Sequence, residues 1–166
     1  MSFSDLGALG ALVVCESGED GMSKILGVDW GRVILGLAVS DDLGIIAQGV
    51  TSLPRVSEAK DVGAIGAYIR DLGVGEIVVG LPKNMDGSLG PSAEAARIFA
   101  RTLHDRLHIP VHLWDERLTS LAAERALLDA GTSRRTRRAL VNQVAATMIL
   151  QGFLDRRRAK ADREDS

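Results

Sequence analysis

Carboxylate side chains stand where two short apolar runs of the chain end. Asp29 closes the run 24–29, and Asp115 and Glu116 follow the run 111–114. Carboxylate oxygens are the ligands that Mg²⁺ and Mn²⁺ prefer, so these acids could converge on one such cation if the two runs form neighbouring strands. Because neighbouring side chains of an extended backbone point to opposite faces, we expect only one of Asp115 and Glu116 to coordinate directly. Acids at strand ends also cap helices and form turns, so the pattern alone leaves both interpretations open.

Basic side chains gather in the C-terminal part of the chain. Between Gly131 and Lys160 there are eight of them against the single acid Asp155, although the net charge of the whole chain is only −2. Such a patch binds backbone phosphates without reading sequence, but a solvated charged helix explains the charge equally well. Positive charge at a helix N-terminus opposes the helix dipole, which favours a functional reason for it. Four of these residues open the last helical pattern, namely Arg134, Arg135, Arg137 and Arg138.

Length and composition bound the class of protein. The chain has 166 residues, 46% of them hydrophobic and 25% charged, which fits one globular domain. Cys15 is its only cysteine, so a disulfide within the chain is impossible and a reducing, cytoplasmic location is expected. The apolar runs are far shorter than the roughly 18 residues of a membrane span, so no membrane association is expected. Aromatic residues make up only 4%, which disfavours an RNA-binding module that stacks bases.

The elements that must position these residues are predicted from hydrophobic periodicity. Apolar runs at 24–29, 33–40 and 45–53 predict three strands, the first two joined as a hairpin by Trp30-Gly31-Arg32. Helices and strands then alternate, which is typical of a mixed sheet with helices on its faces. The later elements are a helix over 57–72, a strand over 76–80, a helix over 92–107, a strand over 111–114 and helices over 118–130 and 133–157. Ligands of such sheets bind at the carboxyl ends of strands, where Asp29 lies.

We expect three parts along the chain. Residues 1–22 precede the first periodic structure and are expected to form a disordered or flexible extension. Their apolar run has no basic residue ahead of it, which argues against a signal peptide. Residues 23–158 are expected to form the domain, and residues 159–166 are charged, lack a core pattern and are expected to fray.

Four blocks of the sequence resemble the RuvX/YqgF family, Holliday junction resolvase-like proteins regarded as pre-16S rRNA nucleases. They occur in the right order at compatible spacing, from about residue 24 to 155, and are together far more specific than any single motif. The blocks are Ile25–Gly31 continuing through Gly36–Asp41, Val79–Ser88, Asp115–Thr119, and Ala145-Ala146 leading to Ile149–Gln151. The resemblance implies an α/β, RNase H-like nuclease domain over 23–158, with a five-stranded mixed sheet of order 3-2-1-4-5 flanked by helices.

The resemblance also implies roles for individual residues. Asp29 matches the metal-bridging carboxylate, and the Asp115–Glu116 pair matches the source of a second ligand, so Mg²⁺ or Mn²⁺ is expected as cofactor, as two ions. A third family carboxylate stands three residues before the Ala-Ala pair, where this chain has Asn142. Asparagine offers one neutral oxygen instead of a charged carboxylate, so metal occupancy and turnover are expected to suffer. The expected catalytic set is therefore Asp29, Asp115, Glu116 and Asn142, with Asp29, Glu116 and Asn142 as metal ligands.

Arginines near these acids are the expected contacts to nucleic acid. The family commonly has Lys-Arg before its second strand where this chain has Val33-Ile34, so Arg32 is either a substitute phosphate contact or a solvated turn residue. Arg117 and the four arginines between 134 and 138 complete the expected binding set.

The implied function is metal-dependent hydrolysis of phosphodiester bonds in structured nucleic acid. RNA is favoured over DNA, and 5′-end processing of pre-16S rRNA, on ribosomal precursor particles, is the implied task. Two alternatives stay open: a nucleic-acid-binding protein without catalysis, which Asn142 favours, and a Holliday junction resolvase acting on DNA. A phosphotransferase of the actin-like fold would need a longer chain, and no phosphate-binding loop motif is present.

Overall fold

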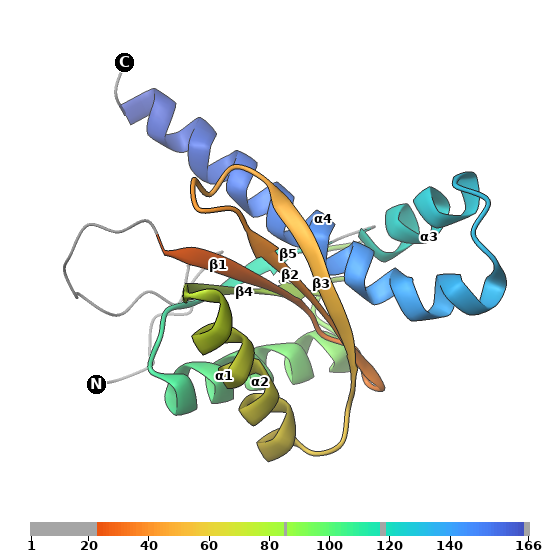
Figure 1. The fold of residues 1–166 in the computed structure, drawn as a ribbon, viewed down its shortest axis with the longest axis horizontal. Coiled ribbons are helices and arrows are strands. Elements are labelled where there is room, and N and C mark those ends of the chain that lie inside the picture. Colours follow the sequence, from red (N-terminus) through yellow and green to blue (C-terminus); the bar gives the residue numbers. More distant parts are fainter. Residues whose placement is uncertain (1–22, 85, 117–118, 165–166) are drawn as a thin grey trace.

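A computed structural model describes residues 23–84, 86–116 and 119–164, and shows a sheet with helices on both faces (Figure 1). The five strands are β1 (Lys24–Asp29), β2 (Ile34–Ser40), β3 (Ala47–Pro54), β4 (Val74–Leu81) and β5 (Val111–Asp115). The four helices are α1 (Glu58–Leu72), α2 (Pro91–Leu107), α3 (Thr119–Asp129) and α4 (Arg134–Glu164). Within these described ranges, no helix is long and apolar enough to cross a membrane.

The strand order is β3-β2-β1-β4-β5, which confirms the order expected for the RNase H-like fold. β1 pairs antiparallel with β2, and β2 with β3, so the predicted hairpin forms. β4 lies parallel to both β1 and β5. The carboxyl ends of β1, β4 and β5 therefore share one edge of the sheet, which is the edge that carries the acids.

Alternation along the central strand divides the interior into two layers. Leu26 and Val28 of β1 face the side covered by α1 and α2, where they join the larger core. Ile25 faces the other side and packs with Ala146 and Leu150 of α4. Asp29 has the same parity as Ile25, so its side chain starts from the face that α4 covers.

The helix ends follow local sequence signals. Ser57 caps α1 by accepting a hydrogen bond from the backbone N–H of Lys60, and Gly73 ends the helix in the left-handed conformation. α2 begins at Pro91 with Gly90 as its N-cap, so the expected capping role of Ser92 is wrong, and proline suits the first helical position.

The last helix is longer than its apolar stripe predicts. α4 continues to Glu164, so residues 159–164, which we expected to fray, are helical. Alanines at 159 and 161 favour helix, and Lys160 lies 3.7 Å from Glu164 one turn later. With 31 residues the helix is about 46 Å long, whereas the six-residue β1 spans about 20 Å. The C-terminal end of α4 therefore projects past the sheet (Figure 1).

Candidate active site

Asp29 and Glu116 meet at the carboxyl edge of the sheet. Asp29 ends β1, and Glu116 follows β5, with β4 between the two strands. The backbone N–H of Glu116 donates to the carbonyl of Leu81 on β4 at 3.3 Å, which carries the pairing of β5 one residue beyond its end. Their side chains are hydrogen-bonded to each other, and each residue is only about one twentieth exposed (5% and 6%). The sheet thus brings together two acids that lie 87 residues apart in sequence.

Burial and mutual repulsion give this pair an unusual affinity for protons. Loss of water raises the pKa of Asp29 to about 6, although the hydrogen bond with Glu116 acts in the opposite direction. Burial also raises the pKa of Glu116 to about 9, followed by the charge of Asp29, their hydrogen bond and the charge of Asp115. Two carboxylates so close in a dry site cannot both stay charged without a cation, so near neutral pH they hold one proton between them.

A glycine on β4 makes room for the pair. A Cβ atom on Gly80 would overlap Oε2 of Glu116 and would lie 2.5 Å from Cδ1 of Ile149 on α4. The same Oε2 atom is buried and has no hydrogen-bond partner in the described structure. An oxygen with an unused lone pair inside the fold is a favourable ligand for a cation, because it is already stripped of water.

Asp115 turns away from this pair, as strand alternation requires. Its carboxylate lies 3.6 Å from the ammonium of Lys83, which follows β4. Of the two neighbouring acids, Glu116 is therefore the one that reaches Asp29. Asp115 contributes its charge, which adds to the raised pKa of Glu116.

Asn142 sits on α4 directly over the strand that neighbours Asp29. Gly36 of β2 pairs with Asp29, and a Cβ atom on Gly36 would overlap the backbone carbonyl of Asn142. The helix therefore touches the sheet at the residue that the sequence singled out, and Asn142 is half-buried there. Among the residues described, no group of three or more His, Cys, Asp or Glu side chains could hold a metal ion. The acids that the described structure brings together are Asp29 and Glu116, and Asn142 lies on the helix that covers the same face of the sheet.

An arginine that the sequence did not single out fixes the turn after Asp29. Arg55 lies over the rings of Trp30 and Phe99, 5.2 and 5.1 Å from their centroids. It also donates to the Gly31 carbonyl at 3.3 Å and to the buried carboxylate of Asp61 at 2.9 Å. These contacts hold the β1–β2 turn in place. In the sequence Arg55 is a single basic residue between Pro54 and Val56, and that local pattern does not reveal which residues it contacts.

The loop after β4, which belongs to one of the four sequence blocks, is closed by its own polar side chains. Asn84 donates to the Ser88 hydroxyl at 2.9 Å, and that hydroxyl donates to Asp86 at 2.6 Å. These bonds explain the polar composition of the loop as turn formation.

The expected arginine contacts are distributed around this edge. Arg32 is exposed in the β1–β2 turn. Arg134 and Arg135 are exposed at the start of α4, whereas half-buried Arg137 donates to the Thr132 carbonyl at 3.4 Å. Arg117 and the side chain of Arg138 lie outside the described residues.

Comparison with known proteins decides the family. A family model described as RuvX, Holliday junction resolvase, matches residues 23–156. The chain belongs to the RuvX family. A relative from Moorella thermoacetica is 55% identical over 133 residues, which is 80% of this chain and 95% of that protein. One from Myxococcus xanthus is 50% identical over 135 residues, or 81% and 89% of the two chains. Both relatives carry the provisional name pre-16S rRNA nuclease.

A solved structure also matches the RuvX domain over most of its length. Thermus thermophilus RuvC in complex with a Holliday junction substrate covers 81% of this chain and 95% of its own, with 17% identity and a TM-score of 0.45. The strand order and the family agree on the RNase H-like fold for residues 23–156.

Proposed function

We propose that this RuvX-family chain is a nuclease that depends on divalent metal ions and cleaves phosphodiester bonds of structured RNA. The observation that carries the proposal is the buried, proton-sharing contact between Asp29 and Glu116 at the carboxyl edge of the sheet. The provisional names of the relatives support a 16S rRNA precursor as substrate, and we propose its 5′ end as the processed part.

Asp29, Glu116 and the amide oxygen of Asn142 are the groups that would hold Mg²⁺ or Mn²⁺. When bound, such ions activate water and offset the charge that develops on the phosphodiester. The protein's own contribution is to keep both carboxylates buried and adjacent, so that they release their proton as the ions bind. Asn142 supplies a ligand oxygen without charge, so we propose that turnover is weakened relative to a chain with aspartate there.

A nuclease assay with a 5′-extended 16S rRNA fragment and Mn²⁺ tests the proposal. We expect slow cleavage by the unmodified chain, none by Asp29→Asn or Glu116→Gln, and at least about tenfold faster cleavage by Asn142→Asp. Asp105→Asn is the matched control, because it removes an exposed acid from the C-terminal end of α2, the end away from Leu81 and Trp30, and should leave the rate unchanged. Equal rates for the unmodified chain and Asp29→Asn would overturn the proposal, and equal rates for the unmodified chain and Asn142→Asp would remove residue 142 from the site.

A binding protein without catalysis is the second candidate. The neutral Asn142 and the missing third acid in the described part of the chain favour it. A binding protein without catalysis would bind RNA tightly and not cleave it. Asn142→Asp would then increase its affinity for metal ions without producing nuclease activity. A four-way DNA junction in the same assay distinguishes a third outcome, because a resolvase would cut the junction faster than the rRNA fragment.

A further inference from the structure

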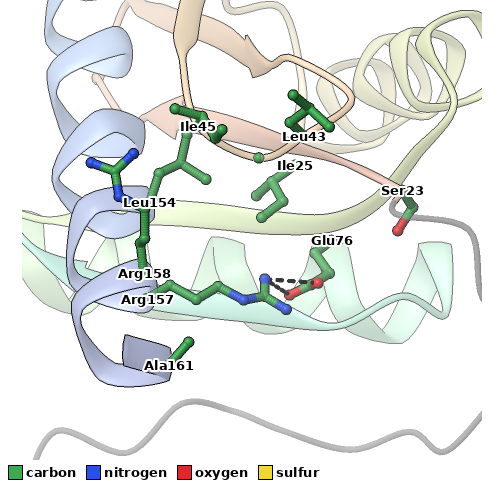
Figure 2. Close-up of a pocket in the computed structure, with 10 residues that line it drawn as sticks. Ser23, Ile25, Leu43, Ile45, Glu76, Leu154, Arg157, Arg158 and Ala161 are labelled. Carbon is green, nitrogen blue, oxygen red and sulfur yellow. Dashed lines mark hydrogen bonds and ion pairs between the residues drawn. The ribbon is translucent and has the colours of Figure 1, made fainter. Parts of the chain in front are cut away.

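A pocket of about 420 Å³ lies at the end of the sheet opposite to Asp29 and Glu116, and Figure 2 shows its walls. β1 contributes Ile25, the turn between β2 and β3 contributes Leu43 and Ile45, and the end of α4 contributes Leu154 and Ala161. This volume falls within the roughly 300–1,000 Å³ of pockets that hold a ligand. Leu43 is 63% exposed, so its large apolar side chain has little cover in the described structure.

The pocket exists because α4 is longer than the sheet beneath it. Leu154 is the last buried residue of the helix. Arg157 and Ala161 continue the same face three and seven residues later and line the pocket, and Arg157 still bonds to Glu76 near the start of β4. The pocket therefore lies between the starts of the strands and the last turns of a helix that outruns them.

Two arginines of α4 line the pocket, and each has an acidic partner. Arg157 donates to both carboxylate oxygens of Glu76 at 3.0 and 3.1 Å (Figure 2). Glu76 is also hydrogen-bonded to Nε2 of His112 at 2.8 Å. Arg158 lies 3.6 Å from Asp155, with both side chains 54% exposed. Because exposed pairs of this kind contribute little, Arg158 can pair with another anion at small cost.

We propose that the chain's own N-terminal segment occupies this pocket. The apolar run Leu6–Cys15 would cover the apolar wall, and the acidic stretch Glu16–Asp20 would lie beside Arg157 and Arg158. The segment enters at the right place, because Ser23, the first described residue, itself lines the pocket. Its charge is complementary as well, since residues 1–22 contain four acids and no lysine or arginine.

Chain length and the family match support this occupant over a separate partner. Eight residues join Cys15 to Ser23 and reach at most about 28 Å, so the apolar run stays near the pocket. A tether this short gives an effective concentration on the order of millimolar. The family match covers residues 23–156, so residues 1–22 and the pocket's Arg157, Arg158 and Ala161 all lie outside it. This inference is independent of the nuclease proposal.

The single cysteine of the chain provides the test. A nitroxide attached to Cys15 of the full 166-residue chain should strongly broaden the methyl NMR signals of Ile25, Leu43 and Leu154, and leave those of Val33 at the opposite edge sharp. Ala161→Glu places a carboxylate among the apolar side chains of the pocket, where it opposes docking of an apolar, acidic segment, and should abolish the broadening. Ala159→Glu is the matched control, because it puts the same charge on an exposed residue of the same helix that does not line the pocket.

Three results would overturn the proposal. One is the absence of selective broadening at Ile25, Leu43 and Leu154. Another is the same loss of broadening in Ala159→Glu as in Ala161→Glu. The last is broadening that arises in a mixture of isotope-labelled, spin-free chains with unlabelled, nitroxide-bearing chains, because the occupant would then be a second copy. Unchanged methyl positions away from the pocket show that each variant is folded.

Discussion

At the scale of single residues, the contact between Asp29 and Glu116 has a cost in the metal-free protein. Both acids keep their protons to a higher pH in the folded chain than in the unfolded chain, because burial disfavours the charged forms. Between the unfolded values of 3.8 and 4.5 and the folded values of about 6 and 9, the folded state binds more protons than the unfolded state. The free energy of unfolding must therefore fall as pH rises through this window.

We expect this fall to shrink when Glu116 is replaced by glutamine. In EDTA, Glu116→Gln should raise the free energy of unfolding at pH 8 by on the order of 2 kcal/mol relative to the unmodified chain, and by much less at pH 5. Urea denaturation at the two pH values measures the difference. Acids with lowered pKa, such as Glu76 and Asp86, lose their stabilising effect only as pH falls to acid values, outside this comparison. Identical pH dependence in both proteins would contradict the shared proton.

The sequence was sufficient to predict a few candidate site residues, but it could not predict which of them contact one another. Strand alternation predicts that only one of Asp115 and Glu116 reaches Asp29. Which of the two does so depends on the register of β5 against β4, in which Asp115 pairs with Leu81. The position of Asn142 follows from the register of α4 against β2, and that register depends on a backbone contact with Gly36. Long-range contacts of this kind leave no local pattern.

At the scale of elements, glycines let α4 lie close to the sheet, with the backbone of Asn142 against Gly36. A Cβ atom on Gly27 would lie 2.7 Å from Cβ of Leu150, and one on Gly36 would overlap the backbone of Asn142. Backbone atoms cannot move aside like the tip of a side chain. The short distance between α4 and strands β1 and β2 is therefore possible only because Gly27 and Gly36 have no side chain.

Gly36→Ala should accordingly push α4 away from β2 and destabilise the fold by about 2–4 kcal/mol. Gly63→Ala is the matched control, because a Cβ on that helical glycine of α1 meets nothing within 4 Å. It should stabilise by about 0.5–1 kcal/mol, as alanine does inside a helix. Chemical denaturation of both variants measures the contrast. Equal stabilities would show that α4 adapts to a larger residue beneath it.

Periodicity was sufficient to predict each strand and helix, with ends displaced by a few residues. Apolar runs define β1, β2 and β4, and Gly73 marks the end of α1. The extension of α4 to Glu164 was not predictable from its apolar stripe, because that stripe ends at Leu154. Beyond Leu154 the helix rests on alanine propensity and pairs such as Lys160 with Glu164, which also occur in irregular charged tails.

At the scale of the whole molecule, the basic start of α4 and the acidic pair lie at the same end of the protein. Arg134 is eight residues from Asn142, or about 12 Å along the helix. Phosphates bound by these exposed arginines would lie near the proposed cleavage site without any reading of base sequence.

Replacing both Arg134 and Arg135 by alanine should flatten the salt dependence of RNA binding. Each phosphate contact contributes about 0.7–0.9 to the slope of log K against log salt, so we expect the slope to fall by about 1–2. Arg106→Ala, an exposed change on α2, is the control and should leave the slope unchanged. Fluorescence anisotropy over a salt series gives both slopes, and a slope insensitive to the double change would exclude this surface from RNA binding.

The place of β5 at the margin of the sheet affects the order in which activity and folded structure are lost on heating. It is a five-residue strand at the margin of the sheet and pairs only with β4. Transient opening of so short a marginal strand needs less free energy than global unfolding, and it would carry Glu116 away from Asp29 while the β1–β2 hairpin stayed intact. Heat inactivation would then precede melting.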